Sequence, residues 1–288
     1  MHALTLLGCT TPLIEERVVE ADVHATWSMG GENDLFGDSV AWREGQLLVA
    51  APGRGCAYLD GEALGTPADW VGWISADRVQ AGRDGRVEVD GEARWQAGAL
   101  AFFAVGERGA VGSTVDTLWT DDAGAVASPG IQNVGVGEDR RLAVVCDSAC
   151  GARAFDDSGA DVGEVAPAGH LGAVAEWRGV AWAGDPQWED DDGAGRVCSE
   201  DGVCVEGLPG DHLGVSIGGG YAAGVFNKWV VPPRARVVPL VDGAVYAFER
   251  GVETRPLALS GDGSTLVIGS PWYPVDGRAS GAVAVVTR

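Results

Sequence analysis

Short apolar runs separated by turn residues fill this chain, and their apolar positions show no helical periodicity. Val, Ala, Leu and Trp dominate runs such as 47–51 and 180–183, and Gly, Asp or Pro interrupts them at close intervals. Apolar runs of this length, bounded by turn residues, are typical of strands joined by tight turns. The pattern predicts an all-β chain.

The apolar runs belong to a divergent internal repeat. A first motif occurs as Leu35-Phe36-Gly37, His170-Leu171-Gly172 and His212-Leu213-Gly214. A second apolar run follows at 47–52, 180–186 and 266–271, and a glycine then opens a third run at Gly55, Gly243 and Gly281. Repetition of short strands predicts small sheets that each pack only against their neighbours, as in a β-propeller.

Turns between the third and fourth strands allow the repeats to be counted. They are expected at 60–61, 90–91, 121–124, 156–159, 200–202 and 249–251, where Asp or Glu precedes glycine. A seventh third strand, 281–286, ends close to the C-terminus and has no fourth strand after it. The N-terminal stretch 17–27 could pair with it and close the ring, which would leave no open sheet edge. We therefore expect seven blades, or six if the short second and third blades merge.

The run Phe36-Gly-x-Ser-Val40, followed by 47–52 and 55–59, resembles the FG-GAP repeat of integrin-α-type β-propellers. The resemblance implies a propeller fold, and FG-GAP units often carry a calcium loop of the type Asp-x-Asp-x-Asp-Gly. The corresponding positions here, 43–45, 178–179 and 218–220, lack those ligands. Residues 260–264 come nearest but fit a hairpin turn better, so we expect no calcium and no other cofactor.

The N-terminus resembles a bacterial lipobox. Leu6-Leu7-Gly8 precedes Cys9, which would be the lipid attachment site, although the preceding segment is shorter than a full signal. We assign 1–16 to a signal remnant and tether and 17–288 to a single propeller domain; a chance match remains the alternative. No run reaches 18 apolar residues, so membrane contact is expected only through the lipid.

Four of the other cysteines are spaced for short disulfide bridges. Cys198 and Cys204 flank an Asp-Gly turn, and Cys146 and Cys150 bound a similar short loop. Neither pair has CxxC spacing or a nearby histidine, so zinc is disfavoured. Both bridges point to an oxidising compartment, hence a cell-envelope or secreted protein. Cys56 is left over and is interpreted as a buried thiol.

Net charge excludes one class of partner. The chain has 20 Lys+Arg and 42 Asp+Glu, a formal charge of −22. Nucleic-acid binding needs clustered basic residues, so a nucleic-acid partner is excluded. Many of the acids fall in the Asp-Gly and Glu-Gly turns, so part of the charge belongs to the architecture.

Long connections in the last three blades, expected at 185–195, 227–242 and 270–280, carry the candidate binding residues. These are Trp188, Trp229, Arg234, Arg236, Trp272 and Tyr273. Long loops rich in Trp and Pro are unusual unless they bind or pack. The alternative is that these rings cap small cores of their own loops.

Sites for metals or catalysis are weakly indicated. Glu189, Asp190 and Asp192 could ligate calcium, but a solvated charge run that pairs with Arg234 and Arg236 fits better. His170 and His212 hold equivalent repeat positions, which favours a structural role over a two-histidine metal site. No nucleophile or phosphate-binding motif is present.

These observations favour a secreted or surface-anchored, non-enzymatic propeller that binds a protein or glycan. One alternative is a polysaccharide hydrolase or lyase with its site at the channel mouth, where dispersed carboxylates could form a pair. A structural assembly scaffold is the other. The oligomeric state is not indicated.

Overall fold

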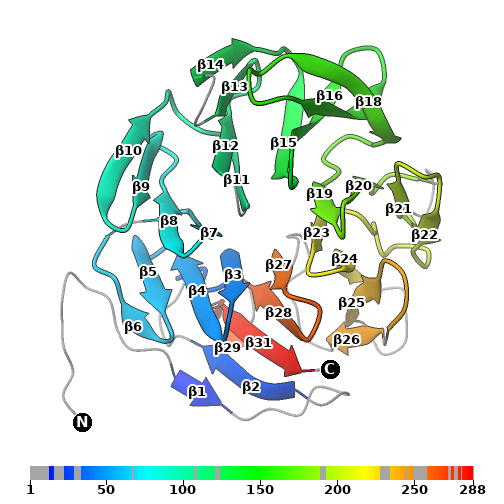
Figure 1. The fold of residues 1–288 in the computed structure, drawn as a ribbon. Helices are drawn as coiled ribbons and strands as arrows, with labels where there is room; N and C mark the ends of the chain where they lie inside the picture. The colour runs from blue at the N-terminus through cyan, green and yellow to red at the C-terminus, as the bar shows by residue number, and fades with distance from the viewer. Residues whose placement is uncertain are drawn as a thin grey trace.

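The computed structural model describes residues 13–15, 23–28, 34–66, 68–106, 109–120, 124–188, 193–227, 234–243, 245–248, 258–271, 274–275, 278–279 and 281–287. Within these ranges all regular structure is β. Seven antiparallel sheets surround a central channel, and a separate two-stranded sheet forms an additional hairpin (Figure 1). The prediction of an all-β, seven-bladed propeller is confirmed, and the six-blade alternative is wrong. No helix in this part of the chain is long and apolar enough to cross a membrane.

The first three blades follow one another along the chain. Blade 1 contains β3 (Ser39–Arg43), β4 (Gln46–Ala51), β5 (Cys56–Leu59) and β6 (Glu62–Ala63). Blade 2 contains β7 (Trp70–Ile74), β8 (Asp77–Ala81), β9 (Arg86–Val89) and β10 (Glu92–Gln96). Blade 3 contains β11 (Phe102–Gly106), β12 (Gly109–Ser113), β13 (Thr117–Thr120) and β14 (Gly124–Ala127).

The next three blades have the same plan. Blade 4 contains β15 (Ile131–Val136), β16 (Arg141–Cys146), β17 (Cys150–Phe155) and β18 (Asp161–Pro167). Blade 5 contains β19 (Val174–Trp177), β20 (Val180–Asp185), β21 (Arg196–Ser199) and β22 (Cys204–Glu206). Blade 6 contains β23 (Ser216–Gly218), β24 (Tyr221–Asn227), β25 (Arg234–Pro239) and β26 (Tyr246–Phe248).

Blade 7 joins the two ends of the chain, as the sequence predicts. It contains β27 (Ala258–Gly261), β28 (Thr265–Ser270), β31 (Ala282–Thr287) and the N-terminal β2 (Val23–Ser28), and β1 (Leu13–Glu15) adds a fifth strand outside β2. Trp27 pairs with Val283 in the β2–β31 ladder, and Figure 1 shows these strands side by side. A hairpin of β29 (Pro274–Val275) and β30 (Arg278–Ala279) lies between β28 and β31.

One blade differs from the strand assignment that the sequence predicts. The segment expected to open the third strand of blade 6, from Gly243, forms the fourth strand β26, and the true third strand is β25. The expected loop 227–242 therefore contains a strand, and the turn assigned to 249–251 follows the fourth strand. Prolines at 232, 233 and 239 give β25 the composition of a loop.

Apolar packing lies between blades rather than inside any one of them. Seven clusters of buried side chains each join two neighbouring sheets. Phe36, Val49 and Tyr58 of blade 1, for example, pack against Val267 and Val283 of blade 7. Burial of apolar area at about 25 cal/mol per Å² therefore holds the blades to one another.

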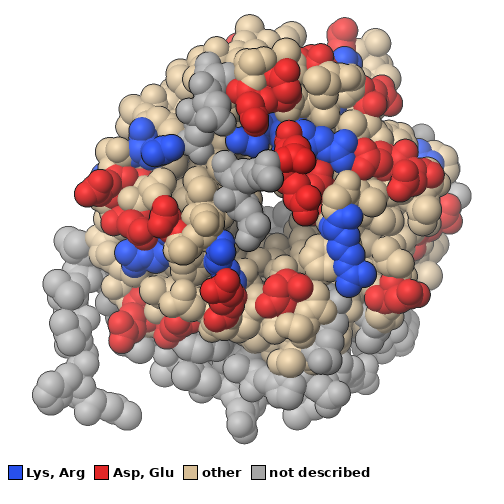
Figure 2. All heavy atoms as spheres, in the orientation of Figure 1, with Lys and Arg blue, Asp and Glu red and all other residues tan. Residues whose placement is uncertain are grey.

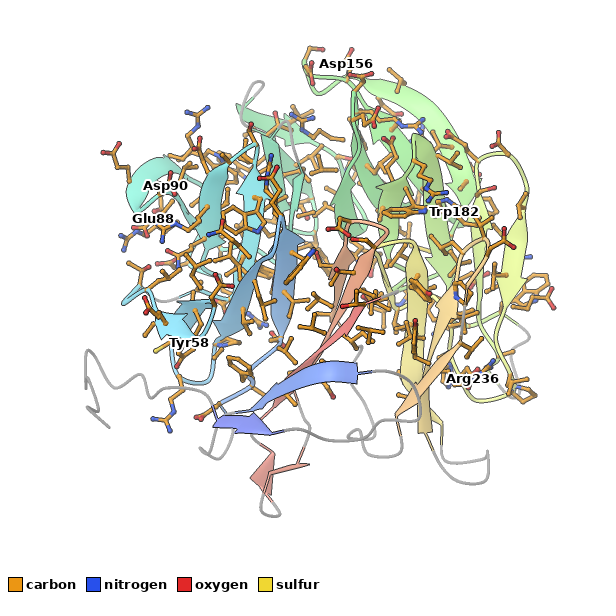
Figure 3. The ribbon with its side chains drawn as sticks, turned by 60° about the horizontal axis from the view of Figure 1, so that its bottom comes forward. Tyr58, Glu88, Asp90, Asp156, Trp182 and Arg236 are labelled. Atoms are coloured by element: carbon orange, nitrogen blue, oxygen red, sulfur yellow. A yellow bond between two sulfur atoms is a disulfide. The ribbon has the colours of Figure 1, made fainter. Side chains whose placement is uncertain are left out.

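The two faces of the propeller differ in their connections. The hairpin face carries the tight turns after the first and third strands, such as Glu44–Gly45 and Asp60–Gly61, and Figure 3 shows Asp90 and Asp156 on this side. The entry face carries the connections between blades and those after the second strands, including Leu35, Pro186 and His212. Acidic and basic side chains alternate around the channel opening in the view of Figure 2, and acidic ones predominate farther out.

Disulfides close two hairpins. Cys146 pairs with Cys150 across β16 and β17, and Cys198 with Cys204 across β21 and β22, at Cα–Cα distances of 4.0 and 4.1 Å. Both predicted bridges are confirmed. Cys56, fully buried at the start of β5, is also disulfide-bonded, so the expectation of a buried thiol is wrong. Spacing in the sequence could not show this, because no other cysteine lies near position 56.

Candidate ligand-binding site

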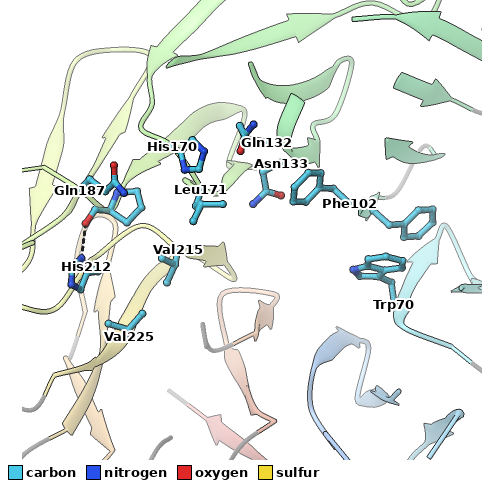
Figure 4. Close-up of a pocket in the computed structure, with 12 residues that line it drawn as sticks. Trp70, Phe102, Gln132, Asn133, His170, Leu171, Gln187, His212, Val215 and Val225 are labelled. Atoms are coloured by element: carbon cyan, nitrogen blue, oxygen red, sulfur yellow. Dashed lines mark hydrogen bonds between the residues drawn. The ribbon is translucent and has the colours of Figure 1, made fainter. Parts of the chain in front are cut away.

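A cavity of about 590 Å³ opens at the entry-face end of the channel. Its lining comes from the first residues of β7, β11 and β15, from the connections that lead into β19 and β23, from the connection after β20 and from β24 (Figure 4). Below it, the first strands of the blades line a channel of about 670 Å³. Five neighbouring blades, 2 to 6, therefore contribute to one site.

Aromatic side chains form the wall on blades 2 and 3. Trp70 begins β7, and Phe102 and Phe103 begin β11. The rings of Trp70 and Phe103 lie 6.1 Å apart, and the Arg83 guanidinium stands 5.7 Å from the Trp70 ring. Arg83 also pairs with Asp69 at 3.3 Å. These contacts fix the Trp70 ring, so the wall is preorganised.

Amides from blade 4 lie beside this wall because β15 contains a bulge. The register with β16 shifts between Ile131 and Asn133, which leaves Gln132 as the extra residue. A bulge turns side chains away from strict alternation, and Gln132 and Asn133 both line the cavity as a result (Figure 4). The Asn133 Oδ1 accepts a hydrogen bond from the backbone N–H of Val134 at 2.9 Å.

Two histidines line the opposite side, and the loop after β20 positions one of them. The His212 Nδ1 lies 3.0 Å from the carbonyl oxygen of Pro186, shown by the dashed line in Figure 4. Gly193 packs so closely on the imidazole that an added Cβ would lie 2.0 Å from its Cε1. His170 is exposed and is followed by Leu171, which is 53% exposed and also lines the cavity.

The equivalence expected between His170 and His212 does not hold in the backbone. His212 has a φ of 48°, and the residue with a similar left-handed φ in blade 5 is Leu171, at 63°. Leu213 is fully buried, whereas Leu171 is exposed. The two histidines nevertheless face the same cavity. Among the described residues, no group of three or more His, Cys, Asp or Glu could hold a metal ion.

Ion pairs clamp the connections around the site. An Asp in the connection that leads into the first strand pairs with an Arg of the same blade in Asp34–Arg54 at 2.6 Å, Asp69–Arg83 at 3.3 Å and Asp211–Arg236 at 2.5 Å. Asp34 and Asp211 are almost fully buried. The pairs keep the entry-face connections in place. They also commit these carboxylates to structure, because a buried carboxylate needs its partner.

Tyr58 lies beneath the first of these pairs, outside the cavity. Burial raises the pKa of its hydroxyl to about 12, an effect that the nearby Arg54 opposes and that Asp34 reinforces. The phenol therefore stays protonated at physiological pH and serves as a packing residue against Phe36, with ring centroids 5.6 Å apart.

Trp188 packs within its own loop. The Arg196 guanidinium lies 3.3 Å from the centre of the Trp188 ring and 3.6 Å from the Asp185 carboxylate. This arrangement matches the alternative in which aromatic residues cap the small core of their own loop. Trp188 does not line the cavity that the structure defines.

Arg234 and Arg236 lie in strand β25 rather than in a long loop. The Arg236 guanidinium pairs with Asp211. The acidic run that was expected to pair with both arginines lies outside the described residues. The other candidates lie outside the described residues: Cys9, Glu189, Asp190, Asp192, Trp229, Trp272 and Tyr273.

Sequence reasoning missed Trp70, Phe102, Gln132 and Asn133 as lining residues. An available signal was the aromatic residue at the start of two successive first strands, β7 and β11. The bulge that exposes Gln132 has no marker of its own in the sequence, because the nearby Pro129 and Gly130 belong to the turn that precedes β15.

Fold and cavity together define a seven-bladed β-propeller with a ligand-sized site at one channel mouth. The chain is similar to the WD40 β-propeller domain of Doa1, with a TM-score of 0.60 and 10% identity over 93% of this chain and 97% of that one. The computationally designed protein Ika8 is similar over 91% of this chain and 98% of its own, with 12% identity and a TM-score of 0.48. No protein-family profile and no curated protein matches the sequence. At these identities the likeness shows the fold alone.

Proposed function

We propose that this chain is an exported, non-enzymatic β-propeller that binds a protein or glycan ligand at the entry-face cavity. The observation that carries the proposal is the composition of the lining, with aromatic rings on one side, imidazoles on the opposite side and the blade 4 amides beside the rings. Ligand sites are mostly apolar clefts of about 300–1,000 Å³ with a few convergent polar groups, and this cavity matches that description.

Binding is favoured over polysaccharide hydrolysis by what lines the cavity. Glycoside hydrolysis uses a pair of carboxylates that flank the scissile bond. The described lining residues include no Asp or Glu. The entry-face carboxylates Asp34, Asp69 and Asp211 are engaged in ion pairs instead.

We also propose that the chain belongs to the FG-GAP type and that the long connections of the last three blades contact the ligand. Phe36 bridges to Gly281 and Leu213 to Gly195, so two copies of the motif contact the residue that opens the third strand of the preceding blade. This recurrence supports a shared repeat. We propose that Trp229, Trp272 and Tyr273 carry ligand contacts beyond the cavity.

Export and anchoring form a separate part of the proposal. The Cys146–Cys150 and Cys198–Cys204 disulfides are typical of an oxidising compartment. Lipid attachment at Cys9 would hold the protein at the cell envelope through its acyl chains. It competes with a third disulfide, because Cys9 is the one cysteine of the sequence left as a partner for Cys56. Peptide mapping without reduction tests this: acylated Cys9 supports the anchor. Cys9 recovered in a disulfide with Cys56 excludes it, because a sulfur in a disulfide cannot also carry a thioether lipid.

Glycan and peptide arrays, probed with labelled protein, test the binding site. Leu171→Ala and Gln187→Ala change exposed lining residues, and we expect each to weaken the ligand found by about tenfold. Leu208→Ala and Gln46→Ala are matched controls, because Leu208 is 42% exposed and Gln46 is exposed, and neither lines the cavity. Binding that all four variants retain would show that the ligand does not use this cavity.

A further inference from the structure

The chemical groups of the entry-face cavity restrict the class of ligand that the proposed function requires. Its polar side chains are the amides of Gln132, Asn133 and Gln187 and the imidazoles of His170 and His212. The lining that the structure describes has no carboxylate, ammonium or guanidinium group.

A charged ligand would find no counter-ion there. An anionic ligand would meet a chain of net charge −22 without an Arg or Lys in the described lining to offset the repulsion. Arg83, which contacts the Trp70 ring of the aromatic wall, is already paired with Asp69. A cationic ligand would lack a carboxylate partner. Both kinds of charge would be desolvated without compensation.

The arrangement of apolar and polar groups matches a sugar ring. A pyranose has apolar C–H faces and a rim of hydroxyls that both donate and accept hydrogen bonds. The Trp70 and Phe102 rings provide flat apolar surfaces, and the amides of Gln132 and Asn133 stand beside them (Figure 4). Amide side chains offer both donors and acceptors, which suits hydroxyl groups. The Val215 and Val225 side chains complete the apolar part of the lining.

We infer that the cavity binds an uncharged oligosaccharide, with aromatic rings of the blade 2 and blade 3 wall against the sugar and the blade 4 amides on its hydroxyls. This inference rests on the proposed function and selects the glycan over the protein ligand. A volume of about 590 Å³ admits a short segment of a chain, so the site recognises a stretch of polysaccharide rather than a single monosaccharide.

Affinity electrophoresis in native gels tests the inference. Galactomannan, xyloglucan and mixed-linkage glucan serve as neutral probes, and alginate and polygalacturonate as anionic ones. We expect at least one neutral polysaccharide to retard the protein, and calorimetry with its hexasaccharide to give an affinity that changes less than about twofold between 0.05 and 1 M NaCl, because salt screens only charge interactions. Phe102→Ala and Gln187→Ala should each weaken binding by about tenfold, and Gln46→Ala should leave it unchanged.

The other outcomes separate this inference from the proposed function. Retardation by anionic probes alone, or peptide binding that Gln187→Ala weakens, overturns the sugar assignment and leaves a binding site at the cavity. Neutral-glycan binding that no cavity variant affects overturns the site itself, and release of reducing ends overturns the non-enzymatic assignment. No retardation by any neutral probe overturns the inference. Gln187 is exposed, so its variant reports on binding even if Phe102→Ala impairs folding.

Discussion

Asp60, Asp90 and Glu200 occupy the same place in blades 1, 2 and 5, the first position of the turn after the third strand. Each side chain accepts a hydrogen bond from a backbone N–H of the second strand, that of Leu47, Arg78 or Ala181, at 2.8 to 3.1 Å. The backbone N–H of each acid donates in return to the carbonyl of that same residue. These acids therefore tie the end of the third strand to the start of the second.

A second acidic network lies at the border of blades 4 and 5. Arg140 donates to Glu200 at 2.7 and 2.9 Å and to Glu176 at 3.0 Å. The hydrogen bond from Arg140 lowers the pKa of Glu200, against the opposing effect of burial, and the backbone of Ala181 adds to the lowering. Part of the −22 charge is thus structural, as the sequence indicates.

Asp262 connects blade 7 to blade 1 and makes stability depend on pH. Its burial acts to raise its pKa, but hydrogen bonds from Ser264, Thr265 and Trp42 outweigh burial and hold the pKa at about 2. A lowered folded-state pKa gives stability that is present above the unfolded value of 3.8 and is lost as pH falls towards 2. Because the side chain is exposed, screening reduces the contribution to about 1 kcal/mol.

We therefore expect Asp262→Asn to lower the free energy of unfolding by about 1 kcal/mol at pH 7 and to have little effect at pH 2. Urea unfolding of both proteins at several pH values measures this difference. A deficit that stays constant from pH 7 to pH 2 would contradict the assignment.

The sequence could not identify the cavity-lining residues whose position depends on a backbone irregularity. The cysteine pairs were predictable because each spans one short hairpin, so spacing alone brings the two residues opposite each other. Gln132 and Asn133 reach the cavity through a bulge, and His212 through a left-handed φ of 48°. Side chain type and spacing carry no information on either feature.

The connection that leads into the first strand of a blade determines how closely that blade packs against its neighbour at the entry face. In blade 1, Gly37 has a φ of 90°, and a Cβ there would lie 2.7 Å from the carbonyl oxygen of Ala282 in blade 7. Gly214 repeats this arrangement in blade 6, with a φ of 106° and the Cα of Gly184 at 2.7 Å. The Phe-Gly and Leu-Gly motifs therefore need glycine for close approach between blades as well as for conformation.

Gly37→Ala and Gly91→Ala separate these two requirements. Both glycines have a positive φ, but an added Cβ at Gly91 would meet nothing within 4 Å. We expect Gly91→Ala to lower the unfolding free energy by about 1 kcal/mol from backbone strain alone, and Gly37→Ala by about 3 kcal/mol or more because backbone must also move. Chemical denaturation measures the unfolding free energy of both variants. Equal losses would show that a Cβ at position 37 is accommodated against blade 7 without destabilising the fold.

Elements were predicted well where Asp-Gly turns mark the hairpins and poorly where proline hides a strand. Asp60–Gly61 and Asp90–Gly91 have positive φ at both residues, as two-residue hairpin turns require. In blade 6 the prolines around β25 led to a loop assignment, which shifted the expected third strand onto β26. The error placed Arg234 and Arg236 among loop residues, so it affected the predicted site as well as the fold.

At the scale of the whole molecule, stability depends on closure of the circle. Each core cluster lies between two blades, and the side chains that blade 7 packs against blades 1 and 6 come mainly from β28 and β31. The outer strand β2 of blade 7 comes from the N-terminus and pairs with β31 along its length. Trp42 of blade 1 adds hydrogen bonds of 2.9 Å to Ser260 and Asp262 of blade 7.

Two truncations test this closure. A chain that lacks residues 1–22 keeps β2, whereas a chain that lacks 1–33 loses it, and both lack Cys9. We expect the longer deletion to lower the thermal midpoint by about 10 °C or more and to speed proteolysis within blade 7, because the deletion leaves the edge of β31 unpaired. The shorter deletion serves as the control. Equal midpoints would mean that β2 adds nothing to the stability of the circle.

The pairing of β2 with β31 also has a consequence for biosynthesis. The ribosome makes β2 among the first strands of the propeller and β31 as its last strand, so the two cannot meet until β31 has emerged. Until then the seventh sheet lacks a strand, and the unpaired edges and exposed apolar surface of the intermediate favour aggregation. A nascent chain of this protein would therefore need shielding, by a chaperone or by export in an unfolded state, until β31 is free to pair with β2.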